Sequence, residues 1–264
     1  MSDELVQYTE PAEHLVSLRL NRPAKLNALS RELEEALLGS VRRACADEAA
    51  RVVVISGAGR AFCAGWDLGE AAPDDAQRQP FSALAGVTTW LELIRLLRRP
   101  DKVFIAAVHG WVAGQGLELS LACDFVVAAA SARLYFAETR VGFAMTSGAA
   151  KLLPAIVGLS RARMLLLTGA TVDAAEAERL GLACQVTADG EHETAALALA
   201  AKVAEGAPLA VAAQKMLLDS ALEMSLPATE HAELLASLRL SGTDDLREAQ
   251  EAFAAKRPPV FAGR

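Results

Sequence analysis

The sequence predicts an α/β protein in which a mainly parallel sheet is followed by a helical C-terminal region. Three observations indicate this fold class. Short apolar segments alternate with segments of helical periodicity in the first half of the chain. Glycine or asparagine turns follow most of the apolar segments, and beyond about residue 146 the spacing is mainly helical. The 264 residues, 53% of them hydrophobic, suffice for a large core.

Four strand-like segments lie in the first half of the chain. Leu15–Leu20 alternates apolar and polar residues, as a half-buried strand does. The other three are almost wholly apolar and so resemble buried strands: Arg51–Ser56, Val103–Val108 and Asp124–Ala128. Because helical segments separate them, we expect these strands to be mainly parallel.

Two helices are expected between these strands. Ser30 can cap the first helix, whose apolar positions have helical spacing: Leu33, Ala36, Leu37 and Val41. The second helix covers Leu84–Arg99 and is ended by Pro100. Between them, residues 70–80 are polar and predict a loop.

The last part of the chain is expected to be helical. The helical segments are 160–168, 173–180, 191–205, 208–222, 227–239 and 243–255. Their apolar faces exceed what one small domain needs. Either partner subunits cover that surface or the helices fold back onto the core.

Composition excludes several classes of function. The net charge of −7 disfavours nucleic acid or an anionic membrane as the main partner. No apolar run is long enough for a transmembrane helix, and the acidic N-terminus does not resemble a signal peptide. The cysteines are scattered and suggest reduced thiols in a cytoplasmic protein: Cys45, Cys63, Cys123 and Cys184. The histidines lack metal-ligand spacing, so no metal is expected.

Two glycine-containing turns share one design, in which an apolar strand leads through small residues into a helix. The first turn ends the segment Val52–Leu68, and the second is Gly110–Gly116. Small residues let a ligand approach the backbone, and the free N–H groups of a first helical turn carry partial positive charge. Two such turns side by side would offer two donors to one oxygen, as an enolate requires. Taken singly, either turn could equally be a plain strand-to-helix connection.

Two glutamates near these turns are candidates for proton transfer. Glu118 lies among apolar residues at the start of the second helix, and Glu138 lies in a short apolar bend before Gly142. Two carboxylates facing one substrate would supply an acid and a base. The alternatives are a solvated glutamate on a helix face for Glu118 and an ordinary loop acid for Glu138.

At this point the sequence resembles the enoyl-CoA hydratase/isomerase family, the crotonase superfamily. The resemblance covers nearly the whole chain, and the order and spacing of its motifs make it specific. The matching segments are 21–23, 25–29, 62–68, 105–110, 114–119, 123–124, Glu138 with Gly142, 167–169, Ala174, Ala177, 181–182 and 252–257.

The resemblance implies a crotonase-like α/β spiral of ββα units with a helical C-terminal trimerisation region. Residues 1–200 would form the core with the acyl-CoA site, and residues 201–264 the C-terminal helices. Members commonly form trimers, often paired into hexamers. No cofactor is implied, because coenzyme A is part of the substrate.

Site residues are also implied by the resemblance. Glu118 and Glu138 fall where hydratases carry two catalytic glutamates, and the backbone N–H groups of Trp66 and Gln115 would form an oxyanion hole. Lys256 matches a lysine that reaches coenzyme A phosphates, often from a neighbouring subunit. The remaining coenzyme A or substrate residues would be Ala24, Lys25, Leu26, Ala64, Asp67, Leu68 and Gly114.

The implied reaction is hydration of a trans-2-enoyl-CoA to a 3-hydroxyacyl-CoA. Double-bond isomerisation and a carnitinyl-CoA style dehydration remain open on the same scaffold. So do binding of acyl-CoA or RNA without turnover, and a structural subunit with a relic site. The presence of both glutamates favours water chemistry, because isomerisation needs one base.

Three departures from the family pattern concern the acyl pocket. Gln115 stands where glycine is common, Ala137 stands where proline often precedes the second glutamate, and Ala144–Gly148 replaces a stretch richer in proline and glycine. Trp90 and Trp111 are expected mainly to pack in the core, with narrowing of the acyl pocket as the alternative role for each.

Overall fold

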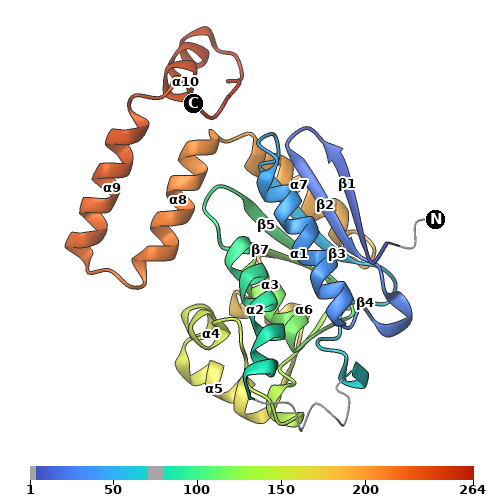
Figure 1. Ribbon diagram of the computed structural model, residues 1–264. Helices are drawn as coiled ribbons and strands as arrows, with labels where there is room; N and C mark the ends of the chain where they lie inside the picture. Colours follow the sequence, from blue (N-terminus) through green and yellow to red (C-terminus); the bar gives the residue numbers. More distant parts are fainter. Residues whose placement is uncertain (1–3, 71–79) are drawn as a thin grey trace.

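The computed structural model describes residues 4–70 and 80–264, without the side chains of residues 70 and 80–87. Within these residues the chain forms two sheets covered by helices, with a helical arm at the C-terminal end (Figure 1). The polar loop predicted at 70–80 lies almost entirely outside the described residues. No single described helix is long and apolar enough to cross a membrane. The helices His192–Ala204 and Pro208–Ala221 meet that test only together, across a 107° bend.

The larger sheet has six strands in the order β1-β2-β3-β5-β7-β10. Its strands are β1 (Val6–Ala12), β2 (Leu15–Leu20), β3 (Val52–Gly57), β5 (Val103–Val108), β7 (Phe125–Ala129) and β10 (Gln185–Thr187). All neighbours are parallel except β1 and β2, so the prediction of a mainly parallel sheet is confirmed. Strand β1 was not predicted, because it is an edge strand that is largely exposed and carries few apolar residues.

The smaller sheet has the order β4-β6-β8-β9. Its strands have three residues each: β4 (Ala61–Cys63), β6 (Trp111–Ala113), β8 (Arg133–Tyr135) and β9 (Thr171–Asp173). The first three each follow a strand of the larger sheet and precede a helix, which gives the repeated ββα units that the resemblance implied. Three residues are too few to show an alternating pattern, so these strands were not predicted.

Ten α-helices and three short 3-10 helices complete the described fold. The α-helices are α1 (Arg31–Ala46), α2 (Pro80–Leu97), α3 (Gln115–Ala122), α4 (Ala149–Val157), α5 (Leu159–Thr168), α6 (Ala174–Leu180), α7 (His192–Ala204), α8 (Pro208–Ala221), α9 (Leu226–Leu240) and α10 (Asp244–Ala255). Ser30 caps α1 as predicted, because its side chain accepts a hydrogen bond from Leu33 N. Helix α2 begins at Pro80, four residues before its predicted start.

Apolar side chains fill both faces of the larger sheet. Along β3, Val53 and Ile55 belong to one core cluster while Val52 and Val54 belong to the other. This follows from the two-residue repeat of a strand. The first cluster includes residues of α1, α2 and α3, and α7 covers the opposite face. Strands buried on both faces explain why β3 and β5 are almost continuously apolar.

Helices α8, α9 and α10 form an arm that extends away from the sheets (Figure 1). Helix α9 has no buried residue. The arm therefore exposes a set of large apolar side chains: Met216, Leu218, Leu222, Leu226, Leu234, Leu235, Leu238, Phe253 and Val260. Folding back onto the core, one of the two explanations for this apolar surface, is wrong for α9.

One buried ion pair ties the arm to the core. Lys215 of α8 places its ammonium group 2.8 Å from Asp124 Oδ2, and it also donates to the carbonyl oxygens of Leu97 and Lys102. Asp124 accepts a second hydrogen bond from Phe104 N. Burial raises the pKa of Asp124, an effect that Lys215 opposes.

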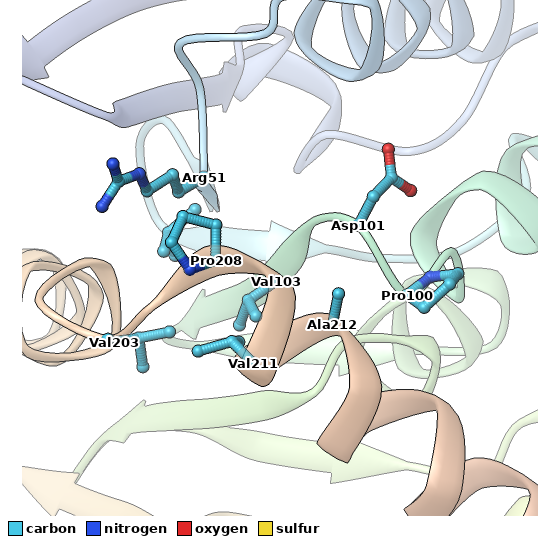
Figure 2. A pocket seen from close by; sticks show the side chains of 10 residues that line it. Arg51, Pro100, Asp101, Val103, Val203, Pro208, Val211 and Ala212 are labelled. Carbon is cyan, nitrogen blue, oxygen red and sulfur yellow. The ribbon is translucent and has the colours of Figure 1, made fainter. Parts of the chain in front are cut away.

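A small cavity lies where the connection between α7 and α8 crosses the first residues of β3 and β5 (Figure 2). Its volume of about 20 Å³ suffices for about one water molecule. Arg51 lines it and donates to the carbonyl oxygens of Ala204 and Phe261. The cavity is therefore part of the joint between core and arm, and it is too small for a substrate.

Glu34 leads to a prediction about stability and pH. This α1 side chain is 2% exposed, and burial, followed by the charge of Glu35, raises its pKa to about 7. A raised carboxyl pKa means that the folded state binds more protons than the unfolded state between pH 4.5 and about 7. The stability associated with this group is therefore lost as the pH rises through that window. Glu34→Gln should raise the free energy of unfolding at pH 8 by about 2–3 kcal/mol.

Chemical denaturation at pH 5 and pH 8 tests this prediction. The gain should be large at pH 8 and small at pH 5. Glu32→Gln is the control, because Glu32 is an exposed acid in the same helical turn. Equal effects of Glu34→Gln at the two pH values would contradict the prediction.

Candidate active site

The first glycine turn directs the backbone N–H of Trp66 away from its neighbouring strand. Leu29 N donates to Gly65 O at 2.7 Å, and Asp67 N donates to Leu29 O at 3.0 Å. These two hydrogen bonds form an isolated parallel β-bridge between Leu29 and Trp66, in which Gly65 and Asp67, not Trp66 itself, bond to Leu29. The N–H of Trp66 itself therefore points to the opposite side, where the described residues offer it no acceptor.

The second turn places Gln115 as the first residue of α3. Gly114 precedes it with φ 51 and ψ −124, a conformation that glycine adopts easily. N–H groups in a first helical turn have no acceptor within the helix. The N–H of Gln115 is thus free among the described residues, as is that of Trp66.

The two turns are in direct contact. A methyl group on Gly65 would lie 3.5 Å from Gln115 N, and one on Gly114 would lie 3.7 Å from Gly65 Cα. A methyl group on Gly116 would overlap Cys63, because it would lie 2.4 Å from the carbonyl oxygen of that residue. The backbones thus pack together with no room for a side chain at Gly65 or Gly116, and the structure places Trp66 and Gln115 on two turns that touch.

Glu118 lies inside the protein in the first turns of α3. Its side chain is 2% exposed, which rules out a solvated position on a helix face. Three hydrogen bonds hold its carboxylate. Trp90 Nε1 donates to Oε2 at 3.1 Å, Thr146 N donates to Oε1 at 3.0 Å, and Thr146 Oγ1 donates to Oε2 at 3.3 Å.

Glu138 begins the short helix η4 (Glu138–Arg140) and has a different environment. It is buried, and neither carboxylate oxygen has a hydrogen-bond partner among the described residues. Burial raises its pKa, and the charge of Glu118 adds to the shift. Its Oε1 lies 4.0 Å from the position of a methyl group on Gly114.

These neighbours form one potential reaction site. Two free N–H groups can stabilise negative charge on one oxygen. Of the two buried carboxylates beside them, one is held by donors and the other has a raised pKa, which suits them to opposite roles in proton transfer.

The residues predicted to line the coenzyme A site lie in and beside η1 (Pro23–Lys25). Ala24 and Lys25 are exposed, while Leu26 is partly buried and has a φ of 52°. Ala64 N donates to Leu26 O at 3.0 Å, so this turn is attached directly to the first glycine turn. The structure thus joins Leu26 to Ala64, two residues before Trp66, and leaves Ala24 and Lys25 exposed on the adjoining turn.

Two polar residues that the sequence analysis did not select hold this region together. Asn27 is fully buried, donates to Ala58 O and Ala61 O, and accepts from Arg22 N. The Arg22 guanidinium donates to Asp67 Oδ2 at 2.7 Å, and this hydrogen bond lowers the pKa of Asp67. Asp67 therefore has a structural partner, whereas Leu68 beside it is exposed.

The structure separates Lys256 from the other predicted site residues of its own chain. Lys256 is exposed and ends α10 with a φ of 54°. Helix α10 lies at the far end of the arm, well away from α3 (Figure 1). A role for Lys256 at this site would need a neighbouring chain.

The sequence analysis treated Trp90 and Trp111 alike, but their positions differ. Trp90 is in the core as predicted, yet its indole N–H reaches Glu118. Trp111 is 45% exposed, so the core role predicted for it is wrong. Its strand β6 is short and its side chain points outward beside Tyr135.

Within residues 4–70 and 80–264 no three potential metal-ligating side chains gather in one place. The four cysteines are unpaired. Burial raises the pKa of the Cys63 thiol, which packs against the second turn, to about 12. That thiol is therefore neutral at physiological pH.

Comparison with known proteins identifies the family. The family model for enoyl-CoA hydratase/isomerase matches residues 10–264. The chain is 35% identical over 264 residues to a probable enoyl-CoA hydratase of Rhodobacter capsulatus, with all of both chains covered. It is 32% identical over 250 residues to the 1,2-epoxyphenylacetyl-CoA isomerase of Escherichia coli, with 95% of each chain covered.

A solved structure supports the same assignment. The crystal structure of a putative enoyl-CoA hydratase from Streptomyces coelicolor matches with a TM-score of 0.92 at 38% identity. The match covers 98% of this chain and 94% of the other.

The contact between Gly116 and Cys63 leads to a prediction. In Gly116→Ala the new methyl group would overlap Cys63, so α3 must move relative to β4. Overpacking of this kind costs about 1–3 kcal/mol of stability. Denaturation should show this loss, whereas Gly39→Ala, which has open space in the exposed face of α1, should be neutral or stabilising. An unchanged free energy of unfolding for Gly116→Ala would contradict the described packing.

Proposed function

The chain belongs to the enoyl-CoA hydratase/isomerase (crotonase) superfamily of enzymes, and we propose that it is a hydratase. It would add water across the 2,3 double bond of a trans-2-enoyl-CoA and give a 3-hydroxyacyl-CoA. The observation that supports this most strongly is the presence of two buried carboxylates, Glu118 and Glu138, beside two free backbone N–H groups.

In the proposed reaction the thioester carbonyl oxygen lies between the N–H groups of Trp66 and Gln115. Glu118 orients a water molecule and takes a proton from it as the oxygen attacks C3. Negative charge then moves to the carbonyl oxygen, where the two donors stabilise the enolate. Glu138 delivers a proton to C2 as the enolate collapses. The raised pKa of Glu138 supports its role as the acid, because a protonated carboxyl group is needed at that step.

Coenzyme A would lie along the turn that carries Ala24, Lys25 and Leu26. This turn is exposed and attached to the first glycine turn, so a ligand bound there can extend toward Trp66. Ala64, Asp67, Leu68 and Gly114 would line the path from this turn to the reacting carbons.

Isomerisation is the second candidate reaction. Glu138 has two oxygens without donors, and a single carboxylate of this kind can shuttle a proton between two carbons. A similar chain, the E. coli 1,2-epoxyphenylacetyl-CoA isomerase, is named as an isomerase of an epoxide rather than of a double bond. The products separate the two candidates, since hydration removes the conjugated double bond and isomerisation moves it.

Crotonyl-CoA tests the hydratase proposal. We expect the wild-type protein to remove the absorbance of the conjugated enoyl thioester, with Glu118→Gln and Glu138→Gln each slowed by about 10² or more. Glu32→Gln, an exposed change on α1, should leave the rate unaltered. No hydration of short-, medium- or long-chain trans-2-enoyl-CoA would refute the proposal, and conversion of a 3-enoyl-CoA to a conjugated product would favour the isomerase.

We further propose that the arm assembles the protein into a trimer, or a hexamer made of two trimers. Helix α9 buries none of its residues within one chain, and Phe253 of α10 is 86% exposed. Exposed apolar surface of this extent is typical of subunit contacts. Assembly would also allow Lys256 to approach the coenzyme A of a neighbouring subunit, where a mobile positive charge suits a phosphate.

Light scattering tests the assembly. We expect at least three times the chain mass of 27.8 kDa. Leu238→Glu places a charge on the apolar surface of α9 and should reduce the mass. Glu233→Gln on the same helix is the control, since Glu233 is exposed and already polar. A wild-type protein that stays monomeric at micromolar concentration would refute the proposal.

A further inference from the structure

The hydrogen bonds around Glu118 come from two distant parts of the chain. Trp90 belongs to α2, and Thr146 lies in the loop before α4. That loop is the stretch Ala144–Gly148 in which the sequence departs from the family pattern. The carboxylate of Glu118 therefore accepts three hydrogen bonds, one from Trp90 of α2 and two from Thr146 of the loop before α4.

These donors leave the two oxygens of Glu118 unequal. A carboxylate oxygen accepts about two hydrogen bonds. Oε2 receives Trp90 Nε1 and Thr146 Oγ1 and is filled, while Oε1 receives only Thr146 N. One acceptor position therefore remains, and it lies on Oε1.

The donors also act on the charge of the group. Hydrogen bonds donated to a carboxylate favour its charged form. The indole N–H is a donor only, so Trp90 cannot adapt to a protonated carboxyl group by accepting a proton from it. Glu138 has no such donors, although it faces the same site.

We propose that Trp90 and Thr146 are positioning residues, which hold the carboxylate of Glu118 in one orientation and present its Oε1 to the reacting water. The proposal rests on the hydratase function, because only water chemistry needs an oriented base at this position. Trp90 is 1% exposed, so its ring is fixed by packing and keeps the carboxylate in one orientation.

Other ionisable groups that face Glu118 are few among the described residues. Glu138 approaches from η4, and its charge is coupled to that of Glu118. Cys63 of β4 packs against Gly116 of the same helix, and its thiol is neutral. Glu138 is therefore the group to control in any titration.

Kinetics against pH form the first test. Trp90→Phe keeps a large aromatic ring but lacks the N–H, and Thr146→Val keeps the shape but lacks the hydroxyl. In both variants the acid limb of the kcat profile should move to higher pH by about one unit, because a donor to the charged form is gone. The loss in kcat should reach up to about tenfold on the acid limb and vanish where the wild-type profile is flat, with KM nearly unchanged. Thr146→Ser should restore the wild-type profile.

The second test needs no turnover. The chain has three tryptophans, so its ¹⁵N-labelled spectrum has three indole N–H signals, and that of Trp90 is the one absent from Trp90→Phe. This signal should shift with pH in the wild-type assembly and in Glu138→Gln, and should lose that shift in Glu118→Gln. The midpoint should rise in Thr146→Val. Trp111→Phe is the matched control, because it removes an indole that does not contact Glu118.

The outcomes separate this inference from the proposed function. If the wild-type protein hydrates no enoyl-CoA but its Trp90 indole signal still shifts with pH, hydration is refuted. The contact between Trp90 and Glu118 is then still established. An indole signal that ignores Glu118→Gln overturns the inference, whatever the activity. So does a Trp90→Phe protein that loses activity equally at every pH, because a merely structural role predicts that result.

Discussion

The contact between two glycine turns is the constraint on which the rest of the site depends. Backbone meets backbone where Gly65 and Gly114 touch and where Gly116 packs on Cys63. Only residues without a side chain allow this approach. The contact fixes the free N–H groups of Trp66 and Gln115 relative to each other, and it fixes the start of α3 and hence Glu118. A side chain at Gly65 or Gly116 would push the two turns apart.

The two glutamates show how one site can contain chemically different carboxylates. Their residue type is the same and both are buried, so the difference comes from their partners. Glu118 has donors from two elements, while Glu138 has none and lies in the electric field of Glu118. Burial without donors favours the neutral form and donors favour the charged form. Packing alone thus makes the two carboxylates different, as the proposed division of proton transfer between them requires.

The arm is attached to the core by buried polar contacts while its apolar surface is left open. Lys215 reaches Asp124 and two carbonyl oxygens, and Arg51 binds the carbonyl oxygens of Ala204 and Phe261. Removing one member of a buried pair leaves an uncompensated charge, so such contacts define position strictly. The arm can therefore present α9 and α10 in a fixed orientation even though α9 packs little against its own core.

The sequence by itself determined the α/β class, the long helices, the four principal strands and both glutamates. Hydrophobic periodicity and turn residues report these features locally, and the resemblance to a known family added the roles proposed for Trp66 and Gln115. Only the tertiary structure revealed the three-residue strands. They are defined by their hydrogen bonds to neighbouring strands and are too short to show an alternating sequence pattern. The tertiary structure also decided the contacts of Trp90 and Thr146 with Glu118, which join residues 28 positions apart on either side. The local sequence does not indicate such a contact. A buried tryptophan in a helix has the same sequence spacing whether its indole packs against a leucine or donates to a carboxylate.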